Sequence, residues 1–377
     1  MRYCYGQKSQ PFQQVKWHKL FFIPGEITMS GVIVPEYSYL YVKLAILKQI
    51  VLSKSEIRKI QNITSIDELI GFIKPYYPDT SFKVQSVSEI EKSLYYSFFK
   101  LIGRILVNSS EELRQFLKYF LMKYEIYNIK NIILGTILNK TKKEKINGTN
   151  FLIEELLDNE NFIRELINKR TLNEIQLYMK KTNYYQVIKE GLDFYKRNQE
   201  IFVLAVYLDK LYYENLSRIK SRFSNIDFAI IETYIKYVVE LYNLKIIYRG
   251  IKNNLEKNLL SQLLINSFLF LNSKKLNLLL NQDTVEAFNQ VLITSLADSK
   301  SGLFTPDILN KGDEDIIVIL KSVYDEYFFK ECHKQVTSLP SLTVSKVLEL
   351  LVKKESEIKD VLIPLVVNIL NVKYQTL

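Results

Sequence analysis

The sequence predicts an all-α protein, and three observations support this fold class. Glycine and proline, at 11 and 8 residues, make up about 5% of the 377-residue chain, whereas an average protein has about 12%. The chain has no Gly-rich phosphate motif of the G-x-G-x-x-G or G-x-x-x-x-G-K-[ST] type. Residues 113–138 and 228–249 carry apolar residues at i, i+3, i+4 and i+7, the pattern of an amphipathic helix. Long helices joined by few tight turns are therefore expected.

Further helices can be placed in order along the chain. A Ser or Thr followed three residues later by Glu indicates a helix start at Ser65 and again at Thr171. Residues 258–273 carry no charge but are too short and too polar for a membrane span of about 20 residues, so a buried helix is expected there. Pro364 falls inside the last expected helix and should kink or stop it. The N-terminus has no apolar signal region, so we expect no secretory signal.

The residue types that most metal sites and catalytic centres need are scarce. The cysteines and histidines are Cys4, Cys332, His18 and His333. Four such residues exclude a four-cysteine zinc site and a disulfide framework. The adjacent acids Glu154 and Glu155 are typical of a solvated helix end. We therefore expect no enzyme activity, no cofactor and no metal.

The net charge of +10 indicates an acidic partner. Only ten of the 51 basic residues are arginine, although base readout and bidentate phosphate binding prefer arginine. A basic surface for an acidic protein explains the charge at least as well as a nucleic-acid surface does.

Three short blocks recur in the same order along the chain. The blocks are residues 65–74 with 171–180 and 284–288, residues 125–130 with 240–245 and 357–361, and residues 208–213 with 323–328. Their offsets of 106–117 residues are far longer than those of TPR, ankyrin or HEAT units. Each repeat is therefore predicted to be a small domain of several helices.

The blocks divide the chain into four segments. These are an N-terminal extension at residues 1–33 and helical repeats at residues 34–140, 141–254 and 255–377. Three similar domains suggest a pseudo-threefold body with a central socket along its axis. Three domains arranged in a line would give the same sequence pattern.

Asparagine recurs at the same place in two of the expected long helices, as Asn128 and Asn243, with Asp360 in the third repeat. Asparagine is a poor residue for a helix interior. We favour a structural role, in which the amide bonds a neighbouring helix or its backbone, over direct contact with a partner.

These blocks resemble the motifs of a known family. Glu-x-Tyr-Asn-[Ile/Leu]-Lys, followed in the second repeat by Tyr248-Arg249-Gly250, is similar to the D-x-x-N-L-…-R helix of the family that contains the C subunit of archaeal A-type ATP synthases and the d subunit of vacuolar-type ATPases. Residues 206–213 resemble its E-x-x-L-D-x-x-Y-Y helix, and residues 37–43 its Y-x-Y-x-x-A-R start. The first repeat departs from the pattern, since Ile133-Leu134-Gly135 stands where the motif has its arginine.

The resemblance implies an all-helical funnel without a catalytic centre. It implies a rotor component of an A/V-type rotary ATPase or ATP synthase that couples the soluble central stalk to the membrane rotor (proteolipid) ring and transmits torque. Such a protein is peripheral, lies at the cytoplasmic face in one copy per complex, and binds no nucleic acid. The residues at motif positions, which are the candidates for partner contact, are Asn128, Lys130, Asp209, Tyr212, Asn243, Lys245, Arg249, Glu357 and Asp360.

A cytosolic all-helical repeat scaffold that binds an acidic protein or a nucleic acid is the alternative. It would share every feature except the three family motifs. Steep salt dependence with DNA or RNA would indicate a nucleic-acid binder. Co-purification with ATPase subunits would indicate the rotor component instead.

Overall fold

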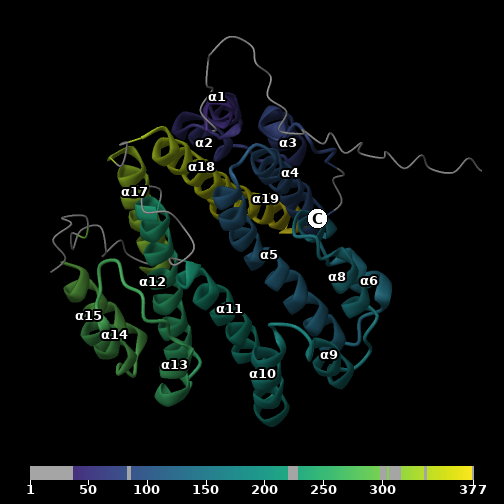
Figure 1. Cartoon of the computed structure of the whole chain (residues 1–377), viewed down its shortest axis with the longest axis vertical. Coiled ribbons are helices and arrows are strands. Elements are labelled where there is room, and N and C mark those ends of the chain that lie inside the picture. Colours follow the sequence, from purple (N-terminus) through teal and green to yellow (C-terminus); the bar gives the residue numbers. More distant parts are fainter. Residues whose placement is uncertain are drawn as a thin grey trace, which may run out of the picture. The chain divides into compact units, whose positions relative to one another are not determined.

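The computed structural model describes residues 37–82, 86–219, 228–297, 304, 316–334 and 338–375. Every regular element in these ranges is a helix (Figure 1), which confirms the all-α prediction. The extension predicted at residues 1–33 lies outside them. None of the helices in these ranges combines the length and the apolar character that crossing a membrane requires.

Six long helices form the centre of the fold. They are α4 (Val87–Val107), α5 (Glu111–Ile137), α11 (Ile201–Ser217), α12 (Phe228–Lys252), α17 (Ile316–Lys334) and α18 (Leu339–Ser356). Helix α11 packs against α5 and α12, α17 packs against α12 and α18, and α4 packs against α5 and α18. The contacts between these helices therefore form a closed circuit. The two helices predicted from periodicity, at residues 113–138 and 228–249, are α5 and α12.

Shorter helices cover the long ones. They are α1 (Ser38–Leu47), α2 (Lys54–Ile60), α3 (Ile66–Ile73), α6 (Lys142–Asn147), α7 (Phe151–Leu156), α8 (Glu160–Ile167), α9 (Leu172–Met179), α10 (Tyr185–Asn198), α13 (Lys257–Leu263), α14 (Ser273–Leu280), α15 (Val285–Ala297) and α19 (Ile363–Gln375), with 3-10 turns η1 (Lys48–Ile50) and η2 (Lys74–Tyr76). Ser65 and Thr171 are the N-cap residues of α3 and α9, as predicted. The Thr171 hydroxyl accepts a hydrogen bond from the Glu174 amide.

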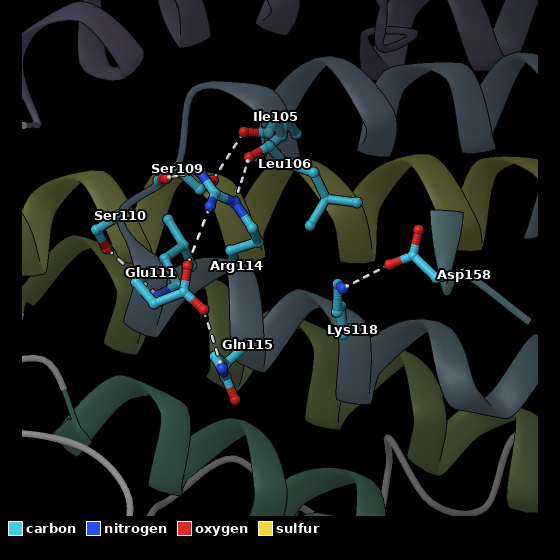
Figure 2. A network of polar contacts seen from close by, with 10 residues as sticks. Ile105, Leu106, Ser109, Ser110, Glu111, Arg114, Gln115, Lys118 and Asp158 are labelled. Carbon is cyan, nitrogen blue, oxygen red and sulfur yellow. Dashed lines mark hydrogen bonds and ion pairs between the residues drawn. The ribbon is translucent and has the colours of Figure 1, made fainter. Parts of the chain in front are cut away.

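Arg114 fixes the tight turn between α4 and α5 (Figure 2). Its guanidinium donates to the carbonyl oxygens of Leu106 at 3.2 Å and Ser109 at 3.0 Å, where α4 ends. The same guanidinium pairs with Glu111 at 3.0 Å. The Ser110 hydroxyl caps the start of α5. One side chain therefore satisfies the end of one helix and contacts the start of the next.

The buried helix predicted at residues 258–273 is wrong over its second half. Helix α13 ends at Leu263, and the next regular helix, α14, starts at Ser273. Between them, the backbone amide of Ile265 donates to Asn243, and those of Leu269, Phe270 and Leu271 donate to Glu240. Because α12 supplies acceptors for these amides, the segment has no need of a helical ladder.

The C-terminal helix continues past Pro364, so the expected stop is absent. Helix α18 passes through a π-helical segment, η4 (Glu357–Leu362), directly into α19, and the run is seen in yellow in Figure 1. Proline lacks an amide hydrogen, and its ring crowds the carbonyl four residues back, which belongs to Asp360. A wider π turn just before the proline accommodates this mismatch.

Replacing Gly250 with alanine is expected to destabilise the chain by about 1–3 kcal/mol, because a Cβ there would overlap the side chain of Leu260, with its Cγ only 3.0 Å away. Gly71→Ala is the matched control. A Cβ at Gly71, inside α3, would meet nothing within 4 Å, so we expect a gain of about 0.5–1 kcal/mol. Urea unfolding of both variants tests this, and equal effects at the two positions would contradict it.

Candidate partner-binding cavity

A cavity of about 1230 Å³ is lined by all six long helices. Each helix contributes at least one polar side chain: Tyr95 from α4, Lys130 from α5, Asp209 from α11, Lys245 from α12, Lys321 from α17 and Glu355 from α18. A second cavity, of about 1030 Å³, is lined by residues of α1, α2, α12, α17 and α18 and shares the charged residues Lys245, Arg249, Lys321, Lys359 and Asp360 with the first. The cavities therefore meet at a common group of charged residues.

Tyrosines make up much of the wall of the first cavity. The Tyr213 and Tyr242 rings lie 4.5 Å apart, and Phe99 meets Tyr124 edge-on at 4.8 Å. Burial raises the pKa of Tyr213 and Tyr242, so these phenols stay neutral. The wall is thus a packed aromatic surface, and its charge comes from lysines, an arginine and carboxylates.

Most carboxylates of the cavity are paired. The Nζ of Lys130 lies 2.7 Å from Asp209, and the Nζ of Lys123 lies 2.5 Å from Glu355. Lys321 lies 2.7 Å from both Asp325 and Asp360. Burial and the positive charges of Lys359 and Lys321 lower the pKa of Lys245 to about 8.

Seven of the nine residues singled out from the sequence line the first cavity. They are Asn128, Lys130, Asp209, Tyr212, Lys245, Arg249 and Asp360. Glu357 lines the second cavity, and Asn243 lines neither. The repeated blocks therefore bring side chains from different repeats together around one space.

Asn128 and Asn243 have the structural role that the sequence favoured. The Nδ2 of Asn128 donates to the carbonyl of Asn150, and its Oδ1 accepts from the amide of the same residue, both at 3.0 Å. Asn243 makes the same two bonds to Ile265, at 2.8 and 3.0 Å. In both cases the bonded residue lies 22 positions further on. Asp360, at the third position, pairs with Lys321 instead.

Glu125 and Glu240, the first residues of one block in the first and second repeats, were not singled out from the sequence. Glu125, Glu240 and Glu357 are all buried. Each accepts a hydrogen bond from a tyrosine hydroxyl, at 2.7 Å from Tyr184, 2.5 Å from Tyr324 and 2.6 Å from Tyr77, respectively. The signal was present, since a charged residue recurs at one place among apolar helix positions, but only Glu357 was singled out.

Glu154 is fully buried, so its expected place on a solvated helix end is wrong. Its Oε1 accepts from the Nδ2 of Asn128 at 2.7 Å. Burial raises the pKa of Glu154 to about 8, an effect that the bond from Asn128 opposes and the nearby Glu125 charge assists. The carboxyl is therefore largely protonated near neutral pH.

Glu154→Gln is expected to remove a pH dependence of stability. The folded chain holds this proton up to about pH 8, whereas an unfolded chain loses it near pH 4.3 or so. The free energy of unfolding therefore falls as pH rises between these values. The free energy of unfolding of the variant should exceed that of wild type by about 1–3 kcal/mol near pH 8 and equal it near pH 4. Urea unfolding at both pH values checks this, and a constant difference between the two proteins would contradict it.

The fold and the cavity define the class of this protein. It is an all-α protein whose long helices surround a cavity. The cavity is much larger than a small ion, and its wall consists of tyrosines and of side chains of both charges.

Comparison with known proteins identifies the family. The profile of a family described as "ATP synthase (C/AC39) subunit" matches residues 41–367, so the chain belongs to this family. The C subunit of the A-type ATP synthase of Methanocaldococcus jannaschii is 22% identical over 89% of this chain and 83% of its own length. Those of Methanosarcina acetivorans and Methanobrevibacter smithii are 22% and 24% identical over 86% and 81% of this chain, and over 86% and 77% of their own lengths. The resemblance seen in the motifs is thereby confirmed, and the chain is a non-catalytic type of subunit.

Proposed function

We propose that this chain is the rotor adaptor of an A/V-type rotary ATPase or ATP synthase. Its central cavity receives the end of the soluble central stalk, and another surface binds the membrane rotor ring. The chain then transmits torque between the two without catalysing a reaction. It sits peripherally at the cytoplasmic face, in one copy per complex.

The closed circuit of six long helices around a cavity of about 1230 Å³ carries this proposal. A torque-bearing adaptor needs a stiff body, and close-packed helices resist deformation. Each predicted repeat contains one pair of long helices. The pairs are α4–α5 within residues 34–140, α11–α12 within 141–254 and α17–α18 within 255–377. We therefore propose that the three repeats surround a pseudo-threefold axis as a funnel, with the cavity as its socket.

The test is to extract membranes in a mild detergent, capture this chain and identify its companions. Recovery of catalytic, stalk and ring subunits in one complex is the expected result. Recovery of the chain alone, with RNA or with unrelated soluble proteins would overturn the assignment. It would leave the all-helical scaffold as the interpretation.

A further inference from the structure

The repeat-related lysines Lys130 and Lys245 differ in their partners. Lys130 of α5 is neutralised by Asp209 of the adjacent α11 at 2.7 Å. Lys245 stands at the matching place on α12, which packs against α17. Asp325 of α17, which lines the second cavity together with Lys245, already accepts bonds from Lys321, Tyr237 and Ser356. Lys245 therefore makes no hydrogen bond or ion pair with any side chain in the described part of the chain.

Two further cations lie beside Lys245. Arg249 follows one turn later on α12, and Lys359 lies in the π-helical segment; both line the two cavities. Neither has a hydrogen-bonding or ion-pairing side chain among the described residues. We call Lys245, Arg249 and Lys359 the cationic cluster.

The charges around the cationic cluster do not balance. Seven cations and five carboxylates line the first cavity, an excess of two positive groups. The cations are Lys92, Lys123, Lys130, Lys245, Arg249, Lys321 and Lys359, and the carboxylates are Asp79, Glu91, Asp209, Glu355 and Asp360. A surplus of this kind in a partly desolvated wall favours an anionic occupant.

Only in the second repeat does this motif position carry a lysine that has no ion-pair partner among the described residues. In the first repeat Asp209 neutralises the corresponding lysine, and in the third repeat the position is occupied by Leu362, which is buried. A partner with acidic groups would therefore find one favourable rotational orientation relative to the three similar repeats. Specificity of this type follows from charge placement more than from contact area.

We propose that the cationic cluster anchors a pair of carboxylates on the end of the protein segment that enters the cavity, and so fixes that segment in one rotational setting. This inference rests on the proposed function, since it takes the occupant to be the central stalk. The large, tyrosine-walled cavity suits a protein segment better than a small anion. A fixed rotational orientation would prevent the stalk from rotating freely inside an adaptor whose three repeats are similar.

The first experiment measures binding of the full chain to the purified central-stalk proteins of the same organism at low and high ionic strength. Lys245→Gln with Lys359→Gln should weaken binding about tenfold or more and flatten its salt dependence. Lys142→Gln with Lys143→Gln is the matched control, because it removes the same charge from exposed positions outside both cavities. Equal losses in the two double variants, or wild-type affinity in the cluster variant, would overturn the proposal.

A second measurement needs no variant. Acetylation of Lys245 and Lys359 in the wild-type chain should be suppressed in the complex with the stalk, while that of Lys142 should not change. Unchanged reactivity at the cluster would overturn the proposal. So would binding of inorganic phosphate that the cluster variant abolishes and the stalk does not displace, since that would identify a small-anion site.

The two proposals fail in different ways. If the wild-type chain does not bind the stalk at all, the proposed function fails. If it binds the stalk but the cluster variant binds equally well, only the anchor is wrong. Circular dichroism and thermal unfolding of the cluster variant show whether it is folded, and removing unpaired like charges should not lower its melting temperature.

Discussion

Replacing Glu240 with alanine is expected to destabilise the folded chain by about 3–5 kcal/mol. The side chain is fully buried in α12. Its oxygens accept the amides of Leu269, Phe270 and Leu271 at 2.8–3.2 Å and the Tyr324 hydroxyl at 2.5 Å. Alanine would leave all four donors without this acceptor, two of them buried and two half-buried, and water would have to enter or the segment would have to move.

Urea unfolding of the full chain measures the loss, and amide hydrogen exchange locates it. Exchange should accelerate at Leu269, Phe270 and Leu271, because these amides lose their acceptor. Glu165→Ala is the control, since this glutamate is exposed and only pairs with Lys169 at 3.7 Å. It should cost less than about 0.5 kcal/mol. A Glu240 variant with wild-type stability and exchange would show that the carboxylate does not organise this segment.

The presence and position of helices were predictable where the local pattern determines the structure. The apolar periodicity of residues 113–138 was sufficient for α5, and a Thr followed by Glu was sufficient for the start of α9. Residues 264–272 were not predictable in this way. Their backbone bonds go to Asn243 and Glu240 on another helix, and a local apolar pattern carries no information about such acceptors.

The candidate site was predictable only as a set of positions. Repetition marked Lys130 and Lys245 equally, yet one is paired and the other has no ion-pair partner among the described residues. The carboxylates Asp325 and Asp360, which line the second cavity with Lys245, both pair with Lys321 instead. Which of two equivalent lysines lacks an ion-pair partner depends on contacts between repeats, and a single sequence does not show these contacts. Glu154 was misplaced for a similar reason, since it is buried where it accepts a bond from Asn128 on α5, a contact that the local sequence does not show.

Lys354 and Glu357 join the two ends of the described chain. The Nζ of Lys354 lies 2.7 Å from Glu357 and donates to the carbonyl of Ile50 at 2.6 Å. Glu357 in turn accepts from the Leu52 amide at 2.8 Å and the Tyr77 hydroxyl at 2.6 Å. Both charged side chains are buried. Because this pair holds the segment around η1 and η2 against α18, it links the first helices to the last of the long ones.

Lys354→Met is expected to cost about 3–5 kcal/mol, because it leaves the Glu357 carboxylate buried without its counter-charge. The double change Lys354→Met with Glu357→Gln should recover part of that loss, since a neutral amide oxygen can still accept from Leu52 or Tyr77 while no unpaired charge remains. Urea unfolding compares the variants, and hydrogen exchange at the Leu52 amide reports on the segment itself. If the double variant is as unstable as the sum of its single changes, the two groups are not coupled. The attachment of the first helices to α18 would then depend on apolar packing alone.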